Sequence, residues 1–241
     1  MLRSLPFAAL FLSLSTAAFA GTGLVEPTLK MTPRHDGRVR VAMTLDACMG
    51  KTDHRILDTL VQEKIPATIF VTARWLKHNS EALAVMMAHP DLFEIENHGE
   101  NHVPAVDKPV AIYGIAAAGS EAAVEQEVEG GRQAIVAMTG FQPQWFRGAT
   151  AKYTTSSMAT INRLGMRVAG YSVNGDGGSL LGAAATAKHI ASARDGDVII
   201  SHINQPTHEA GEGVVRGLLA LKARGVVFTR LDDPSFTPPG N

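Results

Sequence analysis

The sequence predicts an α/β fold, an irregular (β/α) barrel with about seven parallel strands. Short runs rich in Val and Ile alternate with segments whose apolar residues recur at helical spacing. Several runs are almost continuously hydrophobic, which is expected of parallel strands buried on both faces. Residues with metal-binding or acid–base side chains follow several of these runs. An open doubly wound sheet is the alternative, but no Gly-rich nucleotide-binding loop follows the first strand.

The first half of the chain alternates strand and helix patterns. Apolar residues alternate from Val39 to Leu45, and Ala67–Thr72 is a more continuous strand. Helical spacing of apolar residues predicts a helix over residues 54–64, and Ser80 is expected to cap another that runs to Met87. A short strand is expected at 93–96. Residues 103–120 have no clear period and are expected to form a loop, from which Tyr113 could contact substrate.

The second half continues the same alternation. Helices are expected at 121–138, 156–164, 183–193 and 210–223. Strands are expected at 144–146, 167–173, 198–201 and 226–229. Glycines at 165 and 225 end two of the helices.

The N-terminal residues 1–20 are predicted to be a secretory signal peptide. Arg3 provides the positive start, residues 5–15 the apolar centre, and Ala18-Phe19-Ala20 the cleavage pattern. We therefore expect a periplasmic or secreted protein with no membrane attachment after cleavage, and a retained anchor is the alternative. The expected organisation continues with a lead-in segment at 21–38, the barrel at 39–232 and a tail at 233–241.

Composition excludes some classes of partner and scaffold. The formal net charge of −1 gives no electrostatic reason to bind nucleic acid or an anionic membrane. Cys48 is the only cysteine, so a disulfide scaffold is excluded and the fold must depend on a buried core.

Polar residues follow five of the expected strands. They are Asp46, His98, Arg147, the pair Asn174 and Asp176, and His202. In a parallel β/α barrel these positions meet at the carboxyl ends of the strands, where the active sites of such barrels lie. Polarity alone would be expected of any loop, but it does not explain why titratable and metal-binding residue types predominate. We therefore expect a catalytic mouth at this end.

His98 and His102 are the first candidates for metal ligands. A spacing of four residues is about one helical turn, which would place both imidazoles on one side if the chain coils after His98. Two converging neutral imidazoles are a common beginning of a zinc site. The simpler alternative is that both histidines are polar residues at a strand end, hydrogen bonded to the backbone.

The order of these segments resembles the polysaccharide deacetylase family (NodB-homology domain, carbohydrate esterase family 4). The matching segments are Thr44-Leu45-Asp46-Ala47-Cys48-Met49-Gly50, His98-Gly99-Glu100-Asn101-His102, Phe146-Arg147-Gly148-Ala149-Thr150, Ser172-Val173-Asn174-Gly175-Asp176 and Val198-Ile199-Ile200-Ser201-His202. The resemblance extends over residues 39–231. It implies an irregular β/α barrel and a metal-dependent N-deacetylase.

The resemblance also implies roles for individual residues. In the family the first of two adjacent Asp residues is the general base and the second binds the metal; here these positions are Asp46 and Ala47. A third ligand besides His98 and His102 could therefore be Asp46, Asp53 or Asp176. Cys48 is a further possibility, although a thiol that packs beside the site is the preferred interpretation. The remaining possibility is a metal held by two histidines and water. The divalent metal is expected to be zinc.

The other expected roles follow from side-chain chemistry. His202 is expected to be the general acid, since imidazole exchanges a proton near neutral pH. Arg147 is expected to orient Asp46 and keep it ionised, and Asp176 to orient His202. Asn174 is a weaker candidate for contact with substrate.

Three hypotheses for function follow. The first is a secreted, metal-dependent hydrolase that removes N-acetyl or O-acetyl groups from a glycan. The second is a metal-independent hydrolase of small linear or cyclic amides, suggested by Ala47 at a ligand position. The third is a catalytically silent glycan-binding protein, which the low aromatic content of 6% disfavours.

Overall fold

The computed structural model describes residues 23–32 and 36–233, so the expected signal peptide and residues 234–241 of the tail lie outside the described residues. Its main sheet contains β1 (Arg40–Ala47), β2 (Ala67–Val71), β3 (Phe93–Asn97), β6 (Trp145–Phe146), β7 (Arg167–Val168), β8 (Val173–Asn174), β9 (Val198–His202) and β10 (Val227–Thr229). The helices are α1 (His54–Gln62), α2 (Ala73–His78), α3 (Ser80–Ala88), α4 (Glu121–Thr139), α5 (Thr155–Arg163), α6 (Ala183–Ala191) and α7 (Ala210–Ala223), with a short 3-10 turn η1 (Ala149–Ala151).

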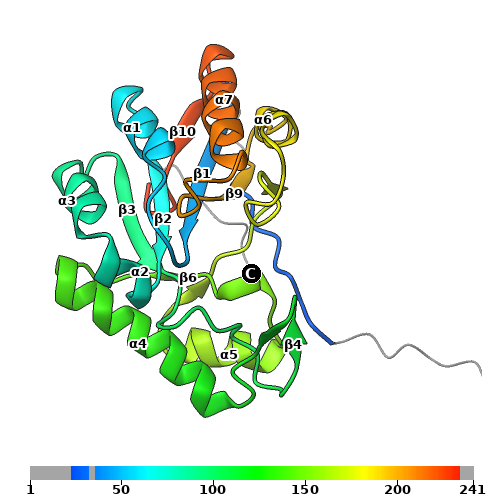
Figure 1. Ribbon diagram of the computed structural model, residues 1–241. Coiled ribbons are helices and arrows are strands. Elements are labelled where there is room, and N and C mark those ends of the chain that lie inside the picture. Colours follow the sequence, from blue (N-terminus) through cyan, green and yellow to red (C-terminus); the bar gives the residue numbers. More distant parts are fainter. Residues whose placement is uncertain (1–22, 33–35, 234–241) are drawn as a thin grey trace, which may run out of the picture.

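Seven strands form a continuous path in the order β7-β6-β3-β2-β1-β9-β8, and β10 pairs with the beginning of β1. All pairs in this sheet are parallel. The sheet curls into an incomplete barrel with helices around it (Figure 1), which confirms the predicted fold class. Among the described residues, no helix is both long and apolar enough to cross a membrane.

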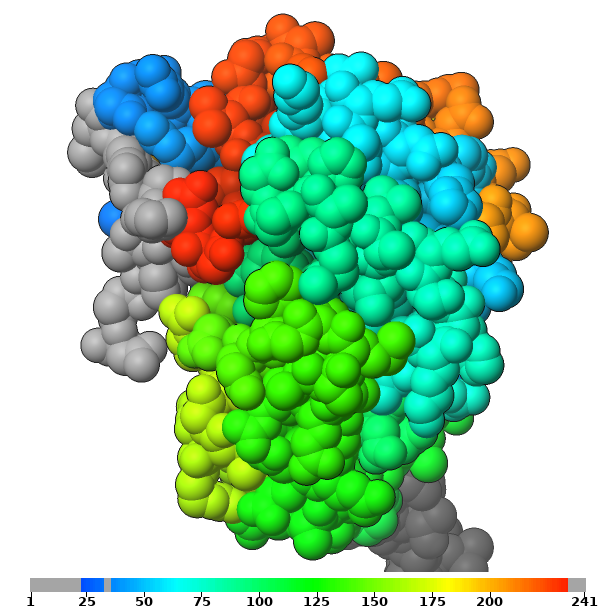
Figure 2. All heavy atoms as spheres, turned by 90° about the vertical axis from the view of Figure 1, so that its left-hand side faces the viewer, coloured from blue at the N-terminus to red at the C-terminus, as the bar shows by residue number. Residues whose placement is uncertain are grey.

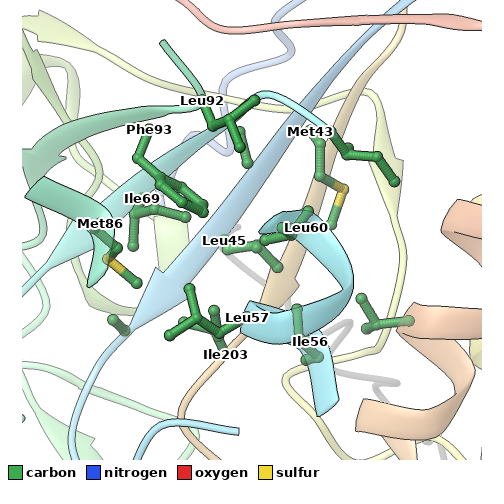
Figure 3. Close-up of a cluster of buried hydrophobic side chains, with 14 of the residues drawn as sticks. Met43, Leu45, Ile56, Leu57, Leu60, Ile69, Met86, Leu92, Phe93 and Ile203 are labelled. Carbon is green, nitrogen blue, oxygen red and sulfur yellow. The ribbon is translucent and has the colours of Figure 1, made fainter. Parts of the chain in front are cut away.

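Alternation along the strands separates two hydrophobic clusters. On β1, Val41, Met43 and Leu45 face the helices, whereas Ala42 joins a second cluster inside the barrel. Figure 3 shows α1 packed on the outer face of the sheet, with Leu57 and Leu60 among the strand residues. Helices α3 and α4 cover another side of the molecule (Figure 2). The barrel interior is therefore lined by alternate strand residues, and these include the polar ones that reach the mouth.

The N-terminal segment, residues 23–32, closes the gap between the sheet edges β7 and β8. Val25 forms an antiparallel bridge with Tyr153, and Lys30 forms another with Asp197. Leu29 and Met31 are buried in the cluster inside the barrel. Part of the expected lead-in segment is thus packed against the barrel.

Three predicted elements were wrong in detail. The single strand expected at 167–173 is split into β7 and β8, which lie at opposite ends of the sheet. The chain must cross the gap here, and a Cβ at Gly170 would collide with the carbonyl oxygen of Pro27. The expected loop at 103–120 contains a hairpin, β4 (Ala111–Ile112) and β5 (Ile115–Ala116). The helix expected from a Ser80 cap is preceded by α2, and Asn79 occupies the cap position.

Candidate active site

A cavity of about 510 Å³ opens at the carboxyl ends of the strands. Asp46, His98 and His202 line it from β1, the end of β3 and β9. Parallel register places Asp46 directly opposite His202 on the neighbouring strand. The predicted mouth is therefore a single hollow into which separated parts of the sequence project.

Asp46 is held by Arg147 in the buried floor of the cavity. Arg147 Nη1 donates to Asp46 Oδ1 at 2.9 Å and to Thr44 Oγ1 at 2.8 Å. The guanidinium carbon lies 4.3 Å from the centre of the Phe70 ring. Burial alone would raise the pKa of the Asp46 carboxyl, but the charges of Arg147 and the neighbouring histidines outweigh it and lower the pKa. Asp46 is thus kept ionised, the form that a general base requires.

His98 is oriented by the backbone of Arg147. Its Nδ1 atom contacts the carbonyl oxygen of Arg147, so Nδ1 carries the proton that this hydrogen bond requires. The other nitrogen, Nε2, lies 3.4 Å from Cys48 Sγ and 3.8 Å from Asp46 Oδ2. Burial alone would lower the pKa of His98, but the charges of Asp46 and Cys48 raise it. Because Nδ1 is engaged, Nε2 is the nitrogen left to bind a metal once its proton is displaced.

The chain does not coil helically after His98. Residues 98–102 form an irregular loop in which Gly99 has φ 93° and His102 has φ 62°. Even so, the rings of His98 and His102 have centroids 5.0 Å apart. The two imidazoles converge because the loop is fixed from outside, and not because of helical periodicity.

Glu127 of α4 fixes this loop, a role that the sequence reasoning missed. Its carboxylate accepts hydrogen bonds from the backbone N–H groups of Asn101 and Val103, each at 3.0 Å to Oε1. Gly99 allows the close approach, because a Cβ there would collide with Glu127 Oε1. Glu127 is only 4% exposed. The sequence signal that could have identified Glu127 was a glutamate on the buried face of a predicted helix.

The chain also brings Cys48 to the two histidines. The Sγ atom of Cys48 and a ring nitrogen from each of His98 and His102 all lie within 4.8 Å of one another. Zinc bond lengths of about 2.3 Å to sulfur and 2.0–2.1 Å to nitrogen, at a tetrahedral angle, require a sulfur–nitrogen separation of roughly 3.5 Å. The observed 3.4 Å between Cys48 Sγ and His98 Nε2 fits this value. The donor set therefore suits zinc.

Strand alternation explains why Cys48, and not Ala47, reaches the cavity. Ala47 is the last residue of β1 and packs into the outer cluster, so a side chain at this position points away from the histidines. Cys48 has the opposite direction and lines the cavity. Its carbonyl oxygen accepts a hydrogen bond from Thr72 Oγ1. The family resemblance assigns the metal-binding carboxylate to position 47. In this chain the next residue, Cys48, faces the histidines instead.

The surroundings of Cys48 favour the thiolate. Burial alone would raise the pKa of the Cys48 thiol, but the charge of His98 and hydrogen bonds from the three nearby histidines hold the pKa well below its ordinary value. Thiolate is the form of cysteine that binds metals. The structure therefore favours Cys48 as a potential metal ligand. The preferred interpretation from the sequence was that its thiol only packs beside the site.

The other carboxylates considered as third ligands have different partners. Asp53 caps α1 by accepting from the Arg55 backbone N–H at 3.1 Å, and it pairs with the Arg55 guanidinium at 2.5 Å. Asp176 accepts from the backbone N–H of His202 at 2.6 Å and lies 3.0 Å from His202 Nδ1. Neither belongs to a group of three potential ligands among the described residues.

His202 is hydrogen bonded to Asp176 through its ring and its backbone N–H. Burial alone would lower the pKa of His202, but the charge and hydrogen bond of Asp176 raise it well above the ordinary value. Since Nδ1 is engaged, Nε2 is the nitrogen left to exchange a proton with a molecule in the cavity. This geometry suits a general acid.

The predicted substrate contacts, Asn174 and Tyr113, both line the cavity. Tyr113 is 78% exposed at the tip of the β4–β5 hairpin. Thr150 and Ala151 also line it, with φ angles of 71° and 50°. Left-handed backbone at residues with a Cβ costs energy and is frequent at functional sites, which marks the turn after Arg147 as part of the site.

A partial β/α barrel with histidine, carboxylate and thiol side chains at one mouth defines a hydrolase-like scaffold. Residues 34–169, more than half of the chain, match the family model described as polysaccharide deacetylase. The chain belongs to the polysaccharide deacetylase family. A comparison with curated protein sequences finds no significant match.

Solved structures have the same fold at low sequence identity. A family 4 carbohydrate esterase from Streptomyces lividans is 18% identical, with a TM-score of 0.64 over 80% of this chain and 93% of that one. The Bc1960 peptidoglycan N-acetylglucosamine deacetylase is 16% identical, with a TM-score of 0.67 over 85% and 90%. BA3943, a pseudoenzyme of this family from Bacillus anthracis, is 19% identical, with a TM-score of 0.63 over 83% and 68%.

Proposed function

We propose that this protein is a metal-dependent hydrolase that removes acetyl groups, N-acetyl groups first of all, from a glycan. The observation that supports this most is the convergence of three functional groups in one cavity. They are the Asp46–Arg147 pair, the Cys48–His98–His102 cluster and the Asp176–His202 pair. Membership of the polysaccharide deacetylase family adds to it.

Cys48, His98 and His102 would hold the metal. With a divalent ion bound by them, most suitably zinc, the site would supply polarisation of the acetyl carbonyl and a water of lowered pKa. The combination of one thiolate and two imidazoles suits zinc, whereas ions such as Mg²⁺ and Ca²⁺ prefer oxygen ligands. The replacement of the carboxylate ligand by Cys48 therefore changes which metals the site selects.

The protein residues would carry the proton transfers. Asp46 accepts a proton from the attacking water, and Arg147 keeps Asp46 ionised and in place through the bond at 2.9 Å. His202 donates a proton to the departing amine, with Asp176 holding its ring through Nδ1. Asp46 and His202 are register partners on neighbouring strands, so base and acid would act on the same reacting bond.

Acetate release tests the proposal. Purified protein is supplied with acetylated chitooligosaccharides or peptidoglycan as isolated, after chelator treatment, and after restoring zinc. We expect release that the chelator abolishes and zinc restores. No release from either substrate with zinc bound would overturn the proposal, and glycan binding without turnover would instead support a silent binding protein.

The contact between Cys48 and His98 favours one second candidate. Sγ lies 3.4 Å from Nε2 of an imidazole whose Nδ1 is fixed, an arrangement found in hydrolases with a thiol nucleophile. This would be the metal-independent hydrolysis of small amides. Activity that survives complete metal removal and is abolished by iodoacetamide would support it over the metal-dependent reaction.

Export is a separate proposal that depends on the sequence of residues 1–20. Removal of this segment as a signal peptide would place the enzyme with its glycan substrates in the periplasm or outside the cell. Fractionation of the producing cell and N-terminal sequencing of the mature protein test it. Mature protein that begins near Gly21 in the exported fraction is the expected result.

A further inference from the structure

One wall of the cavity is made by residues that take no part in the proton transfers or the metal site. It consists of Glu26, Tyr113, Lys152 and Tyr171, which we call the Glu26 wall. Glu26, Tyr113 and Tyr171 line the same cavity as Asp46 and His98. They come from the N-terminal segment, the β4–β5 hairpin and the crossing between β7 and β8.

The wall is tied together by polar contacts centred on Glu26. Glu26 Oε2 pairs with Lys152 Nζ at 2.8 Å, and the Tyr171 hydroxyl donates to Glu26 Oε1. Lys152 Nζ lies 5.8 Å from the centre of the Tyr113 ring. Burial alone would raise the pKa of Glu26, but hydrogen bonds from Lys152 and Tyr171 lower it. The carboxylate is therefore charged, oriented and still 38% exposed.

The backbone fixes Glu26 independently of its side chain. Val25 N donates to Tyr153 O at 2.7 Å, and Tyr171 N donates to Pro27 O at 3.3 Å. Burial of Leu29 anchors the next part of the segment inside the barrel. Docking of the N-terminal segment thus does not require the Glu26–Lys152 pair, and partly exposed ion pairs contribute little to stability. A purely structural role does not account for these side chains.

The chemistry of the wall matches a neutral sugar ring. The charges of Glu26 and Lys152 cancel, so the wall does not select a charged group, but together with Tyr171 it presents several hydrogen-bonding atoms. Tyr113, 78% exposed, offers an aromatic face on which the C–H face of a sugar can pack. In a ligand site, an exposed aromatic ring contributes binding energy, and oriented polar groups beside it fix the orientation of the ligand.

We propose that the Glu26 wall is a saccharide subsite that binds the neutral sugar next to the one carrying the acetyl group, with Glu26 as its specificity-determining residue. This inference rests on the proposed deacetylase function. The N-terminal segment would then contribute to recognition of substrate, in addition to closing the barrel. A monomeric acetyl substrate would reach the reacting groups without touching the wall.

Steady-state kinetics with two substrates test the subsite. Glu26→Gln and Tyr113→Ala are compared with wild type on acetylated chitotetraose and on 4-nitrophenyl acetate. We expect KM for chitotetraose to rise about 3- to 10-fold for Glu26→Gln, because a neutral amide oxygen is a weaker acceptor than a carboxylate, and by a similar factor for Tyr113→Ala. Values of kcat for chitotetraose and of kcat/KM for the small ester should stay within twofold. Glu63→Gln is the matched control. Glu63 pairs with Lys222 at a separation of 2.6 Å, both side chains are comparably exposed, and neither lines this cavity.

The possible outcomes distinguish a failure of the subsite proposal from a failure of the deacetylase proposal. Equal KM values in Glu26→Gln, Tyr113→Ala and Glu63→Gln would overturn the subsite, as would equal losses on both substrates. If wild type hydrolyses neither substrate, the deacetylase proposal fails, and calorimetric titration with chitotetraose then decides the subsite alone. In that case weaker binding in Glu26→Gln than in Glu63→Gln supports it, and no difference overturns it.

Discussion

The Sγ atom of Cys48 lies 3.4 Å from Nε2 of His98, at the separation that two ligands of one tetrahedral zinc ion require. His102 completes the group within 4.8 Å. The backbone carbonyl of Arg147 engages Nδ1 of His98, so Nε2 is the nitrogen left to bind a metal. Cys48 thus stands beside the two histidines, where the proposed metal would need a third ligand.

Cys48→Ala is predicted to lose zinc. Because outer hydrogen-bond partners of metal ligands are themselves worth 10- to 100-fold in affinity, loss of a direct ligand should cost more than about 100-fold. Competition with a chromogenic chelator measures the affinity. Cobalt-loaded wild type should also show a sulfur-to-cobalt charge-transfer band in the near ultraviolet.

Cys48→Asp is the matched variant for this experiment. It should still bind metal through a carboxylate, lack the charge-transfer band and shift preference toward ions that favour oxygen ligands. Unchanged zinc affinity in Cys48→Ala, with the same cobalt spectrum as wild type, would show that the thiol is not a ligand.

Asp46→Asn is predicted to keep its zinc and lose activity. An amide cannot accept the proton of the attacking water, so kcat/KM for acetate release should fall by about 10²- to 10⁴-fold. Metal content of the purified variant is measured in the same preparation. A variant that loses both metal and activity would identify Asp46 as a metal ligand. That result would contradict its assignment as a base separate from the metal site.

Arg147→Met is predicted to destabilise the fold. Arg147 is fully buried against Asp46, and its removal leaves an unpaired buried carboxylate, which costs about 3–5 kcal/mol of unfolding free energy. Urea denaturation of the zinc-free protein measures this cost. Arg163→Met, at an exposed pair with Glu121, should leave the unfolding free energy almost unchanged.

The double variant Asp46→Asn/Arg147→Met should recover part of the loss in Arg147→Met, because the buried charge is then gone. Equal stability of Arg147→Met and Arg163→Met would contradict the assigned role of the buried pair.

The unfolding free energy of Glu94→Gln is predicted to fall less than that of wild type as the pH rises. Glu94 lies in the barrel interior, where its Oε2 accepts from Thr68 Oγ1 at 2.5 Å and from Leu231 N at 2.9 Å. Burial raises the pKa of Glu94, and the nearby charge of Asp232 raises it further. A carboxyl with a raised pKa binds its proton more tightly in the folded state. Its contribution to stability is therefore complete below the ordinary pKa of about 4.3 and is lost as pH rises above that value.

The measurement compares unfolding free energies at pH 5 and pH 8. Wild type and the control Glu63→Gln should lose more stability between these values than Glu94→Gln does. Identical pH dependence in all three proteins would mean that Glu94 titrates normally in the folded state.

The sequence by itself determined the strand and helix alternation and the residues at the strand ends, because hydrophobic periodicity and strand direction are local properties. Asp46, Arg147, Asp176 and His202 could be assigned to one mouth, since parallel strands deliver their carboxyl ends to the same side. The four-residue spacing suggested that His98 and His102 could share one side if the chain coiled, but an irregular loop, and not a helical turn, brings their rings together.

Tertiary structure alone decided which residues complete the site. Cys48 rather than Asp53 stands beside the histidines because β1 alternates its side chains and Asp53 is engaged as a helix cap. Glu127 lies 26 residues from Asn101, the loop residue whose backbone N–H it binds, and Glu26 lies 72 residues before His98. A side chain's partners across such distances depend on how the sheet curls and which loops pack on it, and periodicity along the chain carries no information about either.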